Sequence, residues 1–152
     1  MGTYKLGNIE ELYISKEDIE DRLSQSEIVV DEEGVFIDKF YGKNIDRSIL
    51  LTSIEAYELI EKNHLGKVPY GKLGENILVD FSLGKLKQGD RLQIGKVILE
   101  ITRKCTLCSH LSEIHVELPE LLKDHRGMFA KVIEGGIIEN EENIYYIGNV
   151  NG

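Results

Sequence analysis

The chain has 152 residues, 41% of them hydrophobic and 30% charged, a composition that fits one globular domain covering residues 1–152. Its formal net charge is −9, which disfavours both nucleic acid and an anionic membrane surface as partners. No apolar stretch approaches the roughly 20 residues that cross a bilayer, and the first residues have no segment of signal-peptide type. The chain has only two cysteines, three positions apart, which is unlike a secreted disulfide framework, so we expect a cytoplasmic protein.

The first half of the chain is predicted to contain short strands and one clear helix. Short runs of β-branched residues predict strands at 6–15, 28–30, 35–37 and 48–52. The charged segment 16–26 is expected to form a short helix or an excursion, with Ser15 as its cap and Asp18 three residues on. Apolar residues recur at helical spacing over residues 54–62, and Ser53 is the expected N-cap of this helix.

The second half is predicted to be mostly β. A strand is expected at 77–79, and the strands at 91–94 and 97–102 should form a hairpin through the Gly95-Lys96 turn. Residues 109–126 have apolar positions at helical spacing, and Pro119 divides this stretch or starts its second part. Further strands are expected at 128–134, 137–138 and 143–147. The sequence therefore indicates a mainly β domain.

Three segments resemble a known family when they are considered together. They are Tyr70-Gly71-Lys72-Leu73-Gly74-Glu75-Asn76-Ile77, Leu86-Lys87-Gln88-Gly89-Asp90-Arg91-Leu92-Gln93-Ile94-Gly95 and Arg126-Gly127-Met128-Phe129-Ala130-Lys131-Val132-Ile133-Glu134-Gly135-Gly136. Each is common alone, but their order and spacing resemble the MOSC family, the C-terminal module of molybdenum-cofactor sulfurases, in its small stand-alone bacterial type. The N-terminal part matches more loosely, because Ile37 stands where the family often has glycine before Asp38, and Phe40 lies near a frequent histidine.

The resemblance implies a closed or nearly closed β-barrel with a few short helices. It also implies sulfur transfer or handling of the molybdenum cofactor (molybdopterin), independent of pyridoxal phosphate. The expected partner is a sulfur donor or a protein that carries the cofactor, and the chain is expected to be a monomer or a homodimer. Because Ile37 replaces the glycine of the family pattern, the resemblance does not predict ligand contacts for this early loop.

The two cysteines are the predicted catalytic residues. The sixth residue after Thr102 is Cys108, which matches the family's cysteine, and Cys105 is a nearby second thiol. Sulfur transfer needs a thiolate, and the flanking Arg103 and His110 would favour this form of the thiol. The second thiol could release a carried sulfur by attacking the persulfide and closing a disulfide. If molybdenum binds, Cys108 is the expected soft ligand.

A cofactor that carries a phosphate needs cations and backbone N–H groups. The candidates for this role are Arg47, Arg126, Lys72 and the turn Gly74-Glu75-Asn76, together with Arg103 and His110. Glu75 and Asn76 have an alternative structural role, in which their side chains bond to the backbone and close the loop. His64 and His125 are candidate acid–base groups, because histidine changes charge near neutral pH.

Three other interpretations of the cysteine region stay open. A cysteine can be a small buried hydrophobe without chemistry. Cys105 and Cys108 with His110 and His115 could instead bind zinc, although only one pair of closely spaced cysteines is present. In the third interpretation the chain is a binding module that keeps the barrel without turnover, and a slowly reacting Cys108 would favour it.

Overall fold

The computed structural model describes residues 3–105, 113–125 and 127–151. Its strands are β1 Tyr4–Lys16, β2 Ile19–Gln25, β3 Glu27–Asp31, β4 Gly34–Val35, β5 Ile49–Ser53, β6 Ile77–Val79, β7 Asp90–Ile94, β8 Val97–Lys104, β9 Met128–Glu134, β10 Gly136–Glu139 and β11 Asn143–Asn149. Within the same ranges the helices are α1 Ile54–Lys62, α3 Leu118–Leu121 and the 3₁₀ turn η1 Ile45–Arg47. None of the helices in the described ranges is long and apolar enough to cross a membrane.

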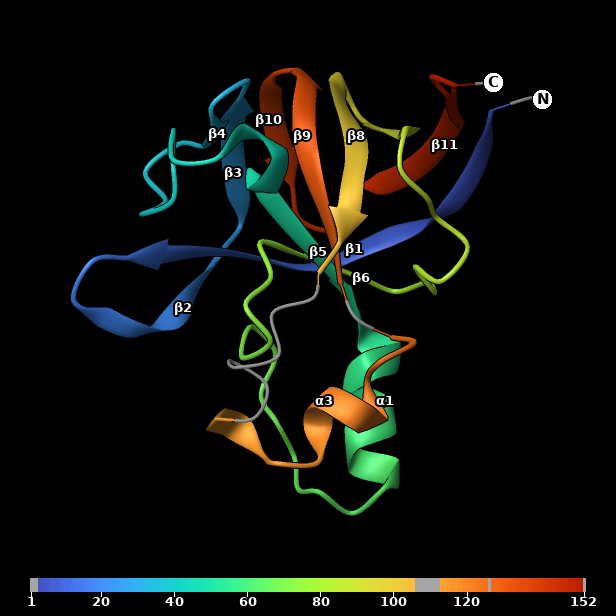
Figure 1. The fold of residues 1–152 in the computed structure, drawn as a ribbon. Helices are drawn as coiled ribbons and strands as arrows, with labels where there is room; N and C mark the ends of the chain where they lie inside the picture. Colours follow the sequence, from blue (N-terminus) through green and yellow to red (C-terminus); the bar gives the residue numbers. More distant parts are fainter. Residues whose placement is uncertain (1–2, 106–112, 126, 152) are drawn as a thin grey trace.

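The largest sheet closes into a barrel, as the family resemblance implied. The strands follow the order β11-β7-β8-β9-β5-β6-β1, and β1 also pairs with β11, which joins the two ends. The long β1 makes this closure because it pairs with β11 near its start, with β6 in its middle and with β2 in its second half. Figure 1 shows the barrel above the helices α1 and α3, with the two chain ends close together on one side.

The barrel is filled by side chains at alternate positions of its strands. In β8, Val97, Leu99 and Ile101 are fully buried, while Ile98, Glu100 and Thr102, each of which follows one of them, are less buried. This period of two is the strand pattern that the sequence shows. A second apolar cluster lies below the barrel, where Ala56, Tyr57 and Ile60 of α1 are joined by Leu118 and Leu122 from the region of α3.

The helical alternative predicted for 16–26 is wrong, because Ile19–Gln25 of this segment forms β2. Its turn is made by Asp18 with a φ of 64°, and the register pairs Ile14 with Leu23. Ser15 belongs to β1 and does not cap a helix, since its side-chain hydroxyl donates to Asp38 at 3.0 Å. Pairing with the long β1 overrides the weak local preference of a charged segment.

The other predicted elements occur close to their expected positions. Ser53 caps α1, with the Glu55 backbone N–H donating to its side-chain oxygen at 3.1 Å. The β7–β8 hairpin turns between Ile94 and Val97, as predicted. Strand β4 ends at Val35, earlier than expected, and β10 begins at Gly136 within the predicted turn. Of the predicted helical stretch 109–126, α3 is confirmed with Pro119 in its first turn, whereas residues 109–112 and 126 lie outside the described ranges.

Candidate functional site

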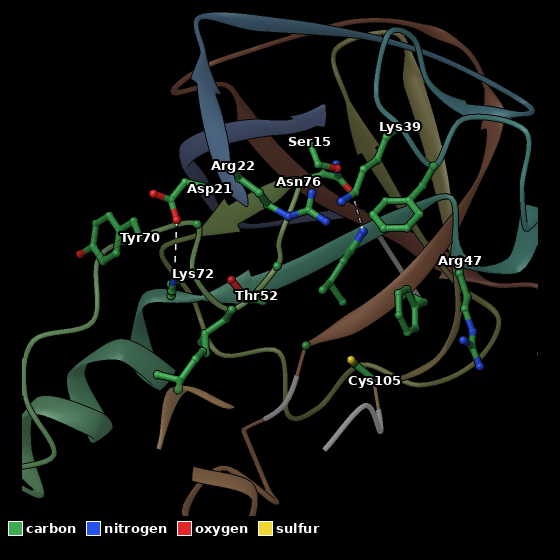
Figure 2. A pocket seen from close by; sticks show the side chains of 18 of the residues that line it. Ser15, Asp21, Arg22, Lys39, Arg47, Thr52, Tyr70, Lys72, Asn76 and Cys105 are labelled. Atoms are coloured by element: carbon green, nitrogen blue, oxygen red, sulfur yellow. Dashed lines mark hydrogen bonds and ion pairs between the residues drawn. The ribbon is translucent and has the colours of Figure 1, made fainter. Parts of the chain in front are cut away.

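A cavity of about 970 Å³ lies where one end of the barrel meets the helical layer. This volume is within the range of about 300–1,000 Å³ that is usual for small-molecule sites. Its walls come from β2, from the loops around residues 39–47 and 69–76, from β5, and from the two chain segments that follow β8 and precede β9. Basic side chains lie on these walls: Arg22, Lys39, Lys43, Arg47 and Lys72. Figure 2 shows Arg22, Lys39 and Arg47 among the residues around the cavity, with Cys105 below them in this view.

Arg22 reaches into the cavity from β2. Its Nη1 lies 3.9 Å from Oδ1 of Asp38, and its guanidinium lies 5.9 Å from the ring centre of Phe40. Burial lowers the pKa of Arg22, while the Asp38 carboxylate acts in the opposite direction. Nη1 is buried and has no hydrogen-bond partner among the described residues. A buried guanidinium N–H without an acceptor is costly, so a donor is available to a ligand at this point.

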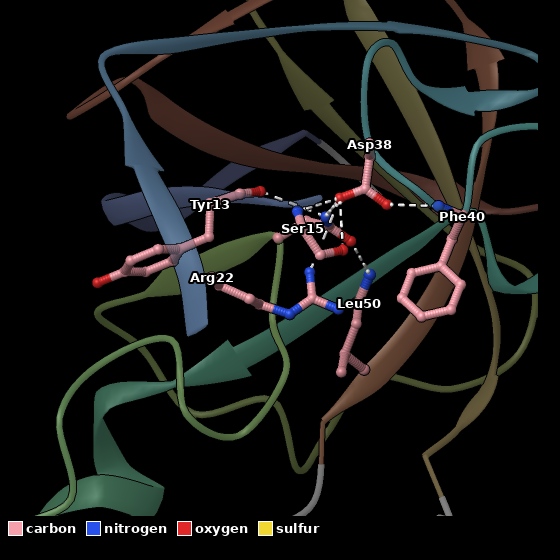
Figure 3. Close-up of polar contacts among 7 residues, drawn as sticks. Tyr13, Ser15, Arg22, Asp38, Phe40 and Leu50 are labelled. Atoms are coloured by element: carbon pink, nitrogen blue, oxygen red, sulfur yellow. Dashed lines mark hydrogen bonds and ion pairs between the residues drawn. The ribbon is translucent and has the colours of Figure 1, made fainter. Parts of the chain in front are cut away.

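Asp38 holds this wall of the cavity together, as Figure 3 shows. Its carboxylate accepts hydrogen bonds from the backbone and side chain of Ser15 at 2.6 and 3.0 Å and from the Phe40 backbone at 3.0 Å. Asn76 donates to the same group at 3.4 Å. A buried carboxylate requires such donors, because desolvation without them is prohibitive. Asp38 therefore fixes the loop that carries Phe40 and Lys39.

Ile37, which stands where the resembled pattern has glycine, adopts a backbone conformation that glycine takes without strain. Ile37 has a φ of 63°, in the left-handed region, where an L-residue with a side chain pays about 1–2 kcal/mol. The chain accepts this conformation, and Asp38 is still directed inward to Ser15 and Arg22. The departure at Ile37 thus leaves the position of Asp38 in place.

In the turn Gly74-Glu75-Asn76, two residues line the cavity and one is buried in the core. Gly74 and Asn76 line the cavity, and Asn76 accepts from the Leu50 backbone N–H at 3.1 Å. Glu75 is fully buried and is not among the described lining residues. Its Oε2 accepts from the Tyr57 hydroxyl at 2.5 Å and from the Gly71 backbone at 3.2 Å. These contacts are those of the structural alternative, in which the side chains close the loop.

Burial, reinforced by the Glu75 carboxylate, raises the pKa of Tyr57 above its ordinary value. The Tyr57 hydroxyl also accepts hydrogen bonds from the backbone N–H groups of Gly71 and Leu73, each at 3.1 Å. This hydroxyl therefore stays protonated, and its hydrogen bonds link α1 to the loop at 69–76.

Aromatic rings and cations are combined at two places on the wall of the cavity. The Arg47 guanidinium lies 5.5 Å from the ring centre of Phe129, and the Lys39 ammonium lies 5.2 Å from that of Phe40. Arg47 Nε and Thr52 Oγ1 are buried and, among the described residues, have no hydrogen-bond partner. The cavity thus offers flat apolar surfaces next to unsatisfied polar atoms.

Cys105 brings a thiol to this cavity from the end of β8. Its backbone N–H donates to the Gly127 carbonyl at 2.8 Å, which joins the chain after β8 to the chain before β9. Gly127 is required at this point because a Cβ there would collide with the Leu51 carbonyl oxygen of β5. The glycine of the third family-like segment therefore allows the close approach that sets Cys105 on the cavity wall.

The structure brings together five of the predicted site residues: Arg47, Lys72, Gly74, Asn76 and Cys105 line the same cavity. Lys72 also contacts Asp21, with Nζ 3.3 Å from Oδ1. Glu75 lies behind the wall, and Arg103 is exposed on β8 and does not line the cavity. Three predicted residues lie outside the described ranges: Cys108, His110 and Arg126.

The sequence prediction missed Arg22, Lys39 and Lys43. Arg22 was not considered because its segment was expected to be helical or an excursion. Pairing of β2 with β1 directs Arg22 toward the cavity. Lys39 and Lys43 lie on either side of Phe40, in the early loop that matches the family pattern only loosely. That loop was the sequence feature that could have indicated these two lysines.

The zinc interpretation requires Cys105, Cys108, His110 and His115 as ligands. In residues 3–105, 113–125 and 127–151, no three His, Cys, Asp or Glu side chains form a group that could hold a metal. Two of the four expected zinc ligands, Cys108 and His110, lie outside these ranges. The third, His115, has its Nδ1 3.9 Å from Glu117 and is not among the lining residues.

Comparison with known proteins identifies the family. The model of the MOSC domain matches residues 19–145 of the chain. The chain belongs to the MOSC domain family. Among solved structures, the MOSC chain is similar to the YuaD protein from Bacillus subtilis, with a TM-score of 0.79 and 16% identity over 97% of this chain and 98% of that one.

Two further structures share the fold of this MOSC domain. YiiM from Geobacillus stearothermophilus has a TM-score of 0.71 and 16% identity, covering 96% of this chain and 75% of that chain. YiiM from Escherichia coli has a TM-score of 0.65 and 18% identity, covering 94% of this chain and 71% of that chain. No curated protein matches the sequence. At these identities the similarity establishes the barrel fold.

Proposed function

We propose that this MOSC-domain protein uses its large cavity either to bind the molybdenum cofactor or to carry sulfur on a cysteine. The observation that supports the proposal is the placement of the Cys105 thiol on the wall of a cavity that also holds Arg22, Lys39 and Arg47. Soft thiolates suit molybdenum and transferable sulfur, and cations suit a phosphate. A cytoplasmic setting would keep both thiols reduced.

The residues present fit the molybdenum cofactor in size and in polarity. Arg22 and Arg47 each have a buried N–H atom without a described partner, and such donors suit phosphate oxygens. Phe40 and Phe129 offer flat surfaces for a ring system, and the volume of about 970 Å³ accommodates one. Lys72 is a weaker candidate because Asp21 already compensates its charge. When bound, the cofactor would supply redox chemistry at its metal, and Cys105 or Cys108 would hold the soft end.

Sulfur carriage uses the same residues without requiring a bound metal. A cysteine thiolate attacks the outer sulfur of a donor persulfide, forms a new S–S bond and releases the donor as a thiolate. The second cysteine then attacks the inner, cysteine-bound sulfur of the carried persulfide, releases hydrosulfide and closes a disulfide. Cys108 is proposed as the principal thiol from the family pattern, with Cys105 as its helper. The protein's partner is then a sulfur donor or a protein that carries the cofactor.

Mass spectrometry after incubation with glutathione persulfide tests sulfur carriage. The peptide that contains both cysteines should gain the mass of one sulfur atom, and this gain should disappear on treatment with a thiol reductant. Cys108→Ser should abolish the gain, and Cys105→Ser should prevent its release as hydrosulfide. Sulfur loading of Cys108→Ser equal to that of the parent protein would refute the role of Cys108 as the principal thiol.

Cofactor retention is tested by measuring molybdenum and oxidised pterin in the protein purified from a host that makes the cofactor. Arg47→Met should reduce retention at least tenfold, the effect of losing about 1.4 kcal/mol of binding energy. Lys85→Met is the matched control, since Lys85 is an exposed cation away from the cavity. Equal retention by Arg47→Met and Lys85→Met would refute the anion site. Slow labelling of Cys108 together with absent retention would favour the binding-module alternative.

A further inference from the structure

The three-stranded sheet of β3, β4 and β10 has one face on the barrel core and the other in solvent. Ile28 and Val30 of β3, Val35 of β4 and Ile138 of β10 are buried in the core cluster of the barrel. Side chains of a strand alternate between its two faces, so the residues next to these four point outward. Figure 1 shows the three strands beside one another, on the part of the molecule away from helices α1 and α3.

Three apolar side chains form a row across the outer face of this sheet. Val29 pairs with Ile137 of β10. The Phe36 backbone N–H donates to the Val29 carbonyl at 2.8 Å, which continues the pairing of β3 with β4. Val29, Phe36 and Ile137 are 44%, 56% and 53% exposed, and none of them lines the cavity. Single exposed apolar residues are ordinary, whereas a contiguous row with polar borders is typical of an interaction surface.

Carboxylates lie on both sides of this row. Two positions from the apolar pair and on the same face, Glu27 of β3 is directly opposite Glu139 of β10. On the other side, Asp31 is two positions beyond the pair, and the turn that follows contains Glu32 and Glu33. All of these residues except the half-buried Asp31 are exposed. The outer face is therefore apolar along its centre and acidic along both borders.

This sheet has no basic residues that could compensate its carboxylates. Residues 27–37 contain four acidic residues and residues 136–142 contain three, and neither range contains lysine, arginine or histidine. No ion pair joins any of these carboxylates to a basic residue of the described ranges. In the adjoining loop, Lys39 lies over the Phe40 ring and Lys43 is 3.9 Å from Glu17. Like charges directly opposite each other destabilise a sheet, and a cation placed between them would remove that cost.

We propose that this face docks a basic partner, a protein segment or surface whose apolar side chains are flanked by lysine or arginine. The apolar row supplies the area that is removed from water, and the two acidic borders orient the partner and speed its association. A second copy of this chain does not fit, since it would bring a net charge of −9 and its own carboxylates against the same groups. The proposal is independent of the proposed function, because it uses no residue that lines the cavity.

The test is fluorescence anisotropy of a labelled synthetic peptide of alternating lysine and leucine, titrated with the full chain at low and at physiological salt. The peptide should bind, and binding should weaken as salt is added, because the carboxylates are exposed. The double variant Val29→Thr, Ile137→Thr keeps β-branched side chains but removes apolar area, so it should weaken binding about tenfold. Val116→Thr, Val150→Thr is the matched control, because both valines are exposed and lie outside this sheet.

A second double variant tests the carboxylates separately. Glu27→Gln, Glu139→Gln should weaken peptide binding about fivefold at low salt and reduce its salt dependence. Glu58→Gln, Glu61→Gln is the matched control, with both carboxylates exposed on α1, and it should leave both quantities unchanged. The melting temperature of Glu27→Gln, Glu139→Gln should stay constant or rise, because a like-charge pair is removed. A lower melting temperature would show that these carboxylates serve the fold, and would contradict the proposal.

The proposal would be overturned if the folded chain did not bind the lysine–leucine peptide, or bound a glutamate–leucine peptide equally well. The same weakening in the control variants would also overturn it. Sedimentation equilibrium of the chain alone tests the other occupant: a dimer that Val29→Thr, Ile137→Thr abolishes would assign the face to a second copy instead. Weaker peptide binding in both test variants, with both controls unchanged, would support the basic partner.

Discussion

Asp38 is predicted to be the largest single polar contributor to the stability of the cavity wall. Its side chain is only 4% exposed and accepts hydrogen bonds from Ser15, Phe40 and Asn76, with Arg22 at 3.9 Å. Asp38→Ala leaves the Ser15 and Phe40 donors without this acceptor and leaves the buried Arg22 guanidinium without the carboxylate 3.9 Å away. Removing one member of such a group costs about 3–5 kcal/mol, so we expect the free energy of unfolding to fall by that amount.

Urea unfolding followed by circular dichroism measures this loss directly. The slope against denaturant should stay constant, since the change removes contacts without altering the area that unfolding exposes. Asp46→Ala is the matched control, because Asp46 is exposed, and its substitution should change stability by less than about 0.5 kcal/mol. A loss below about 1 kcal/mol for Asp38→Ala, or a loss equal to that of the control, would show that the wall does not depend on this carboxylate.

Three more predictions concern the backbone and the tyrosines. Ile37 and Ile137 are both about half exposed, but Ile37 alone has a left-handed φ, so Ile37→Gly should cost about 1–2 kcal/mol less than Ile137→Gly in urea unfolding. Tyr57→Phe leaves the buried Glu75 without its hydroxyl donor and should lower the unfolding free energy by about 2–3 kcal/mol; a neutral effect would contradict the assigned contact. Burial raises the pKa of Tyr13 to about 12, so stability present below pH 10 should be lost as pH rises toward 12, and Tyr13→Phe should flatten this loss.

Local patterns were sufficient to predict most of the barrel. The alternation over residues 97–102 fixes which side chains of β8 face inward, and Gly95 permits the turn back to β7. Ser53 can cap α1 through contacts within one turn of the helix. Such features depend on neighbours in sequence, so they can be read without knowledge of the fold. Closure of the sheet came from the family resemblance, because pairing of β1 with β11 joins the two ends of the chain.

The cavity could be predicted only in part, because it depends on contacts between distant segments. Arg47 and Lys72 were found from family-like segments, and both line the cavity. Arg22 was not found, since its orientation depends on β2 pairing with β1 and on Asp38, sixteen residues further along the chain. His125 was considered as an acid–base group, but its partner Glu55 lies 70 residues away and is visible only in the structure.

Several departures from ordinary folding rules lie on or next to the wall of this cavity. Arg22, Arg47 and Thr52 each have a buried polar atom without a described hydrogen-bond partner, and Ile37 has a left-handed backbone conformation. Each unsatisfied atom costs about 1–3 kcal/mol, a considerable sum against a typical domain stability of about 5–15 kcal/mol. The barrel core, by contrast, is filled by ordinary aliphatic side chains at alternate positions. Costs of this kind are usual where a site must recognise a ligand, because groups satisfied within the protein are not available to bind it. An anionic ligand that accepts from Arg22 and Arg47 should therefore both bind and stabilise the fold, and a rise in the melting temperature with added inorganic phosphate, absent in Arg22→Met, would be the direct sign of it.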